Sequence, residues 1–182
     1  MDEWIDILDL QGNYTRKRAL KSEAHRKGLF HPTVHVWFHT QDGLILLQQR
    51  AKNKDTYPLR WDVSVAGHVG AGEQIMEAAL REVEEEIGLN ISKDDLAAIG
   101  TFKSVQAPAK DILDCEFHHT FICFLGVGLN ELKKQGSEVA DLKLITINEM
   151  EKELLNPELS KTYVPHETDY YMSVLKAIKK RL

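Results

Sequence analysis

Three glutamates at helical spacing are the residues of this chain that are best placed to do chemistry. Glu82, Glu85 and Glu86 stand at i, i+3 and i+4, so in a helix their carboxylates fall within an arc of about 100°. At about 4 Å and an effective dielectric of about 20, each close pair repels by about 4 kcal/mol. No lysine lies between Gly67 and Leu89, and hard cations such as Mg²⁺ or Mn²⁺ take oxygen ligands. The cluster therefore indicates either a metal site or a solvated acidic helix face.

The segment around the glutamates predicts a helix that follows a flexible loop. Met76, Leu80, Val83 and Ile87 form one apolar stripe at i, i+4, i+7 and i+11. Gly88 stands where a helix often ends in a left-handed residue. Three glycines, at positions 67, 70 and 72, precede the stripe. We expect the helix to bury its apolar stripe and to present the glutamates on a different side.

The order of residues from Gly67 to Leu89 resembles the Nudix box, G-x5-E-x7-R-E-U-x-E-E-x-G-U, in which U is apolar. Every specified position is matched, by Gly67, Glu73, Arg81, Glu82, Val83, Glu85, Glu86, Gly88 and Leu89. The resemblance implies a metal-dependent enzyme that acts on a diphosphate-containing substrate. It implies that Glu82, Glu85 and Glu86, with the Gly67 carbonyl, hold Mg²⁺ or Mn²⁺, and that a glutamate of the box is a candidate general base. It also implies that Arg81 orients the acidic cluster through an ion pair with Glu73.

Residues around the start of the box and elsewhere in the chain are similar to the isopentenyl-diphosphate isomerase branch of the same superfamily. The residues that match this branch are His31, Ser64, Val65, Gly67, His68 and Glu116. Asp114 stands where that branch has a glutamate, and Ala66 stands where it has a catalytic cysteine. Alanine cannot exchange a proton, so the resemblance favours hydrolysis over isomerisation. An isomerase-like enzyme and a non-catalytic nucleotide-binding module are the alternatives.

Five side chains are candidates for roles beside the box. Glu116 and Glu138 are candidates for the base that activates water, and Glu116 equally suits the surface of an edge strand. Arg50, Lys54 and His68 are candidates for contacts with substrate phosphates. A surface position is an equally good interpretation of Arg50, and a turn position suits His68.

The remaining histidines carry weaker signals. His31 either packs locally or belongs to a second metal site. His35 and His39 alternate on one strand face, which is typical of a plain surface pattern. Adjacent His118 and His119 must point to opposite sides of a strand, so at most one of them faces a site.

Periodic patterns predict a fold that mixes strands and helices. Strands and hairpins are expected at residues 4–16, 33–50, 61–66, 96–105, 115–125 and 142–147, with loops at 52–60 and 106–111. Helices are expected at 148–155 and 167–182, and the apolar face of the last helix comprises Tyr171, Val174, Leu175 and Ile178. We expect an α+β fold, namely an α/β/α sandwich of the Nudix type with a mixed sheet. Residues 30–182 are expected to form this domain, and residues 1–29 a short β-hairpin extension with a linker.

Composition limits the classes of substrate and partner. The chain has 182 residues and a net charge of −5, without the basic excess that a nucleic-acid backbone requires. Cys115 and Cys123 fit buried thiols better than a disulfide. The acidic N-terminus lacks signal-peptide features and no apolar run is long enough to span a membrane, so we expect a cytoplasmic protein. The expected substrate is a small compound such as a nucleoside diphosphate linked to another moiety, and residues 1–29 allow a homodimer.

Overall fold

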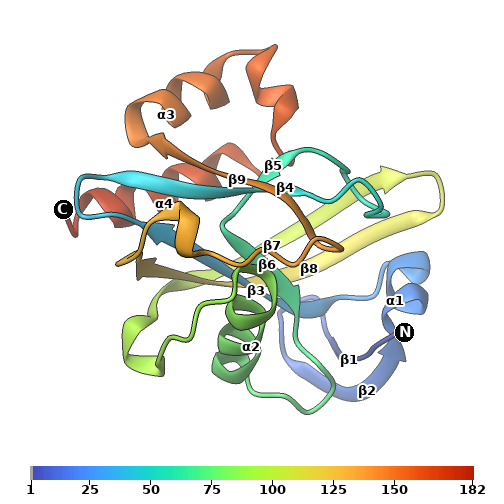
Figure 1. Cartoon of the computed structure of the whole chain (residues 1–182). Coiled ribbons are helices and arrows are strands. Elements are labelled where there is room, and N and C mark those ends of the chain that lie inside the picture. The colour runs from blue at the N-terminus through green and yellow to red at the C-terminus, as the bar shows by residue number, and fades with distance from the viewer. Residues whose placement is uncertain (1) are drawn as a thin grey trace.

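A computed structural model describes residues 2–182 and shows a mixed sheet between helical layers (Figure 1). The seven strands of this sheet are β3 (His31–His39), β4 (Leu44–Arg50), β5 (Trp61–Asp62), β6 (Val65–His68), β7 (Ala97–Ala109), β8 (Ile112–Phe124) and β9 (Val139–Thr146). A separate antiparallel hairpin comprises β1 (Trp4–Leu8) and β2 (Tyr14–Leu20). The α-helices are α1 (Lys21–Lys27), α2 (Ile75–Ile87), α3 (Ile147–Leu155) and α4 (Thr168–Lys179), and short 3₁₀ turns cover Lys93–Asp95, Leu129–Glu131 and Leu159–Thr162. The predicted α+β class and the predicted hairpin are confirmed.

Two hydrophobic clusters on opposite faces of the sheet hold the helices to it. Val34 and Phe38 of β3 lie in the cluster that contains Val83 and Ile87 of α2. Trp37 points to the other face and lies in the cluster that contains residues of α3 and α4. Figure 1 shows the same arrangement, with α2 on one side of the sheet and α3 and α4 on the other. All nine residues of β3 are buried, because this central strand is covered on both faces.

The surface position predicted for His35 and His39 is wrong. Their exposed fractions are only 4% and 6%. On a central strand with two covered faces, alternation of polar and apolar residues does not separate the outside from the inside. His35 lies on the face of α4, where its Nδ1 is 2.6 Å from the hydroxyl of Tyr170.

The predicted hairpin over residues 33–50 is only partly right. The turn is present, because the amide of Thr40 donates to the carbonyl of Leu44 at 2.9 Å. However, β3 and β4 share a single residue pair, and β3 instead runs parallel to β8 and antiparallel to β6. The register of β3 with β8 places His31 opposite Glu116, and that pairing builds one part of the site.

The strand predicted at residues 61–66 is two strands that pair with different partners. β5 pairs with β4, and β6 pairs with β3. Between them, the hydroxyl of Ser64 donates to the Leu46 carbonyl and accepts from the Phe38 amide at 2.8 Å. Ser64 thus replaces the hydrogen bonds that the backbone loses where the chain crosses from one strand to the next.

The loop predicted at residues 106–111 is mostly strand. β7 continues to Ala109, and only Lys110 and Asp111 form the turn into β8. The pairing is irregular between Gln106 and Ala109, the segment that contains Pro108. A bulge of this kind accommodates a residue without an N–H, so proline does not end the strand here.

The N-terminal hairpin and α1 pack against the body of the sheet. The hairpin begins as predicted but extends to the end of β2, and α1 follows directly. The amide of Leu8 donates to the Phe30 carbonyl at 2.7 Å, and the amide of Ala71 donates to the Trp4 carbonyl at 2.8 Å. A small cluster comprising Ile5, Ile7, Ala19 and Ala24 forms its interior. The first segment is therefore fixed beside the loop that precedes α2.

Several local predictions are confirmed. Helix α2 ends at Gly88, whose φ of 69° is left-handed. The four residues predicted as the apolar face of α4 are all buried. Both cysteines are buried free thiols. No helix within residues 2–182 combines the length and the apolar character needed to cross a membrane.

Candidate active site

Helix α2 presents the three glutamates of the box to one cleft with a volume of about 400 Å³. Glu86 is buried, and its Oε2 accepts hydrogen bonds from the Ala66 amide at 3.1 Å and from Gln48 Nε2 at 3.0 Å. Burial and the neighbouring charge of Glu82 raise the pKa of Glu86 to about 8. Burial also raises the pKa of Glu82. One buried and one half-buried carboxylate with raised pKa values fit a divalent cation, because a cation stabilises their charged forms.

Arg81 joins the carboxylates of the box to one another. Its Nε and one terminal nitrogen bind both carboxylate oxygens of Glu73, at 2.8 and 3.0 Å. The other terminal nitrogen lies 2.7 Å from Glu82 and 3.2 Å from Glu85. Arg81 also donates to the His68 carbonyl at 3.0 Å. The ion pair expected with Glu73 is present, and Arg81 additionally relieves part of the repulsion that the glutamate spacing creates.

A second cluster lies in the same cleft and is built from three histidines and one glutamate. One potential ligand atom from each of His25, His31, His68 and Glu116 lies within 4.8 Å of the others. Oε1 of Glu116 is 3.5 Å from Nε2 of His31 and 3.5 Å from Nε2 of His68. Asp114 stands beside the cluster, with Oδ1 3.5 Å from Nε2 of His25.

The protonation of this second cluster fits a metal cation. Burial lowers the pKa of His25 to about 4 and holds the pKa of His68 well below its usual range, so both are neutral near pH 7. His31 Nδ1 donates to the Leu29 carbonyl at 2.9 Å, and its buried Nε2 has no hydrogen bond within residues 2–182. The buried Oδ1 of Asp114 has none either. Although burial opposes it, Glu116 raises the pKa of His31, so this position favours a positive charge. Two neutral imidazoles and a third that attracts positive charge, beside a carboxylate, suit a transition metal better than Mg²⁺.

The cleft contains a further group of histidines and an aspartate that the sequence interpretation did not assign to the site. Its lining includes His35, Asp62 and His166. The ring of His35 stacks on that of His118, with 4.0 Å between centroids. Of the adjacent histidines on β8, His118 is therefore the one that faces this interior, while His119 contacts Thr101 on the other side of β8.

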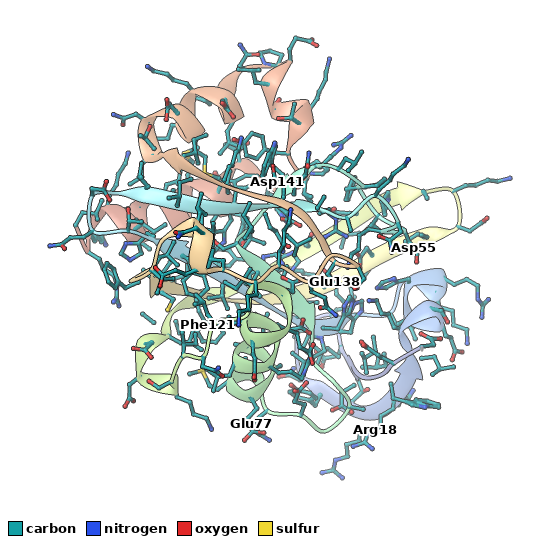
Figure 2. The ribbon with its side chains drawn as sticks, in the orientation of Figure 1. Arg18, Asp55, Glu77, Phe121, Glu138 and Asp141 are labelled. Carbon is teal, nitrogen blue, oxygen red and sulfur yellow. The ribbon has the colours of Figure 1, made fainter. Side chains whose placement is uncertain are left out.

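The predicted phosphate contacts all line the cleft, but two of them are already paired. Arg50 donates to the Thr56 carbonyl at 2.9 Å and to Asp62 Oδ2 at 3.2 Å, so it also fixes its own loop. Lys54 forms an ion pair with Glu138. Glu138 and Asp55, both labelled in Figure 2, line the cleft. Glu116 also lies in the cleft, and not on an outer strand surface.

The first 29 residues supply three side chains to the cleft that the sequence interpretation left outside it. These are Glu3, Lys21 and His25. Lys21 forms no ion pair within residues 2–182, in contrast to Lys54 and Arg81, so its charge is free for an anion. No local motif marks these residues; their position depends on how α1 docks against β8.

A sandwich with an intact box helix beside a polar cleft defines a Nudix protein. The NUDIX domain model matches residues 29–165. An uncharacterized Nudix hydrolase of Clostridium acetobutylicum is 32% identical over 203 residues, which cover 97% of each chain. An isopentenyl-diphosphate Delta-isomerase of Serratia proteamaculans is 31% identical over 137 residues, which are 75% of this chain and 72% of that protein.

The fold agrees with these relatives. DR0079 from Deinococcus radiodurans has a TM-score of 0.66 at 16% identity, with 98% of both chains covered. The chain belongs to the Nudix family, and within it to the hydrolases. Nudix hydrolases generally use divalent metals, so the two carboxylate-containing clusters are the places to look for them.

Proposed function

We propose that this chain is a metal-dependent pyrophosphohydrolase that cleaves the diphosphate bond of a small hydrophilic metabolite, such as a nucleoside diphosphate linked to another moiety. The observation that carries the proposal is the convergence of the box glutamates on a cleft whose walls are almost entirely polar. Among the residues that line the cleft, only Ala66 and Val164 have apolar side chains, and only Tyr57 has a largely apolar one.

Glu82, Glu85 and Glu86, with the Gly67 carbonyl, hold Mg²⁺ or Mn²⁺ in this proposal. The bound cation would neutralise diphosphate oxygens and lower the pKa of a water molecule. Arg81 keeps Glu82 and Glu85 in position and is too heavily engaged to bind substrate. Lys21 places an unpaired positive charge on the wall of the cleft, and Arg50 and Lys54, which are paired with Asp62 and Glu138, lie on the same walls. In this proposal these cations hold the diphosphate.

A glutamate of the box is a better candidate for the water-activating base than Glu116 or Glu138. The carboxylate of Glu138 is already engaged in an ion pair with Lys54. Although burial opposes ionisation, the His31 side chain, whose Nε2 lies 3.5 Å from Oε1 of Glu116, holds the pKa of Glu116 well below its usual range. A group with so low a pKa is a weak base, and Glu116 instead suits a ligand in the histidine cluster.

The histidine cluster is proposed as a second cation site. His25, His31 and His68 offer nitrogen atoms and Glu116 an oxygen atom, which suits Mn²⁺ or Zn²⁺. Because the histidine cluster lies in the same cleft as the box glutamates, cations at both sites would be able to act on one diphosphate.

Isomerisation of a prenyl diphosphate is the weaker alternative. Ala66 has no group that exchanges protons with a carbon skeleton. Beyond Ala66 the cleft continues to His35, Asp62 and His166, which offer no apolar surface to a hydrocarbon chain. Incubation with isopentenyl diphosphate in deuterated water tests this alternative, because deuterium bound to carbon is a product of isomerisation alone.

The decisive experiment is a phosphate-release screen with Mg²⁺ and Mn²⁺ against nucleoside diphosphates, sugar nucleotides, dinucleotides and isopentenyl diphosphate. An added phosphatase reveals monophosphate products. Glu86→Gln should abolish turnover and leave the fold intact. Glu84→Gln is the matched control, since it removes the same charge from an exposed position of the same helix. Equal activity of the two variants would contradict the proposed site, and nucleotide binding without any turnover would support a binding module.

A further inference from the structure

An aspartate–histidine pair in the cleft is separate from both carboxylate-containing clusters. We propose that Asp62 and His166 form a recognition site for a hydroxyl group in the non-phosphate part of the substrate. This inference rests on the proposed function, because it specifies which diphosphates the cleft selects. It excludes substrates whose second part is a bare hydrocarbon.

Hydrogen bonding fixes the tautomer of His166. Its Nε2 lies 3.0 Å from Oδ1 of Asp62. The Asp62 carboxylate also accepts from the Val63 amide at 2.8 Å and from Arg50 at 3.2 Å, and is buried. A carboxylate that accepts hydrogen bonds from three donors is ionised, and an ionised carboxylate has no proton to donate. Nε2 of His166 therefore carries a proton, and in the tautomer with a single ring proton Nδ1 is left as an acceptor.

His166 lines the cleft, and its free nitrogen is not fully buried. Nδ1 has no hydrogen-bond partner within residues 2–182. Unlike Nε2 of the neighbouring His118, it is not among the buried atoms that lack a partner, and His166 is part of the cleft lining. An exposed acceptor in a fixed tautomer binds a donor such as a hydroxyl group, and a substrate without a donor would leave it unpaired.

Four rings hold the imidazole of His166 in place. Ring centroids of His35, His118, Tyr170 and Tyr171 lie 5.3, 5.5, 5.1 and 5.5 Å from it. Burial lowers the pKa of His35 and of His118, and raises that of both tyrosines, so all four rings are neutral near pH 7. Asp62 is therefore the charged group that faces His166 directly. Such a rigid surround lets the acceptor bind without loss of side-chain freedom.

The strand register connects this pair to the box. Ala66 of β6 lies opposite His35 of β3, and the Ala66 amide donates to Glu86. His35 in turn packs edge-on against His166. A substrate whose phosphates lie at Glu86 thus passes Ala66 before it reaches His166. In this order the metal-binding residues contact the diphosphate, and the aspartate–histidine pair contacts the group attached to it.

Kinetics with hydroxyl-deleted substrates tests the proposal. The best substrate of the screen and its deoxy analogues are compared in the wild type and in His166→Ala, with thermal unfolding as a check on folding. We expect one deoxy analogue to lose about tenfold or more in kcat/KM with the wild type and less than about threefold with the variant. His119→Ala, which changes a histidine on the other side of β8, should retain the wild-type discrimination. The same loss for every analogue in both proteins would overturn the proposal.

A measurement without turnover separates this inference from the proposed function. Long-range ¹H–¹⁵N NMR spectra of histidine-labelled protein report which nitrogen of His166 carries the proton. We expect a protonated Nε2 in the wild type, loss of this single tautomer in Asp62→Asn, and a shift of Nδ1 on addition of α,β-methylene ADP or a methylene analogue of a sugar nucleotide with Mg²⁺. If the Nδ1 signal shifts on addition of an analogue but the wild type hydrolyses no substrate, the proposed function is refuted and the recognition site is retained. A protonated Nδ1, or no shift with any analogue, would refute the recognition site.

Discussion

Gly67 lies so close to Glu82 that a Cβ atom at position 67 would be 1.9 Å from the carboxyl carbon of Glu82 and 2.2 Å from its Oε1. The first residue of the box is a glycine because the Glu82 side chain fills the space that a side chain at position 67 would need. The contact also holds the Glu82 carboxylate against the Gly67 backbone, where both were proposed as metal ligands.

Gly67→Ala should therefore displace Glu82 and abolish metal-dependent activity. Overpacking of this kind costs about 1–3 kcal/mol of stability. Turnover and thermal unfolding of the variant measure the two effects. Gly136→Ala is the control, because an added Cβ at Gly136 meets no atom within 4 Å. An active Gly67→Ala enzyme would mean that Glu82 has no part in catalysis.

Arg81→Lys should weaken metal binding although it preserves the charge. Lysine cannot bind both oxygens of Glu73 while it also reaches Glu82. Loss of a residue that orients metal ligands typically costs about 10–100-fold in metal affinity or activity. The dependence of turnover on Mg²⁺ and Mn²⁺ concentration measures this cost. Arg18→Lys, which changes an exposed ion pair with Asp6, should leave that dependence unchanged.

His25→Ala should weaken transition-metal binding at the histidine cluster by about tenfold or more, because one of its four ligand groups is lost. Co²⁺ is a suitable probe, since its absorption spectrum reports nitrogen coordination. Binding of Co²⁺ to His119→Ala should match the wild type. If His25→Ala binds Co²⁺ as tightly as the wild type does, the cluster is not a metal site.

Asp62→Asn should reduce the acid sensitivity of the fold. Although burial opposes ionisation, the hydrogen bond and charge of His166 and the charge of Arg50 lower the pKa of Asp62 below its ordinary value of 3.8. The stability from this group is therefore complete above its ordinary pKa and is lost as the pH falls toward the pKa of the folded state.

Thermal unfolding measured from about pH 3 to about pH 7, a range that brackets the ordinary pKa of aspartate, reports this dependence of stability on pH. The variant should have a lower Tm than the wild type near neutrality, because Arg50 loses its ionic partner and His166 loses a carboxylate acceptor. The difference should shrink as the pH falls. Parallel curves for the two proteins would show that Asp62 is not the group that titrates.

Local patterns predicted the parts of the fold that depend on nearby residues. The apolar stripe and Gly88 define α2, and the predicted face of α4 is buried. In the α2 stripe, Val83 and Ile87 are buried and Met76 and Leu80 are partly buried, whereas Glu86, expected on a different side, is buried as well. The prediction for His35 failed because the element that covers it is distant in the sequence, since Tyr170 of α4 lies 135 positions away. The prediction for residues 106–111 failed for another reason. The β8 residues that pair with this segment are close in sequence, and the irregular pairing lets the strand continue through Pro108.

The candidate site divides in the same way. The glutamates and Arg81 are close in sequence and could be identified from their spacing on a helix. His25, His31, His68 and Glu116 come from α1, β3, β6 and β8, and meet only because β3 pairs in register with β8 and α1 docks beside it. His166 precedes α4 and reaches Asp62 across 104 positions of sequence. Side chains brought together in this way carry no spacing signal.

His25 and Lys21 both lie on the N-terminal segment, so this segment can influence which metal the cleft prefers. The part of the chain that matches the family begins at residue 29, after both of them. Replacement of the first 28 residues alone would change a proposed metal ligand and a cation of the cleft together, without any change in the box. If the histidine cluster binds a metal as proposed, a graft of this segment between two relatives with identical boxes should transfer metal preference.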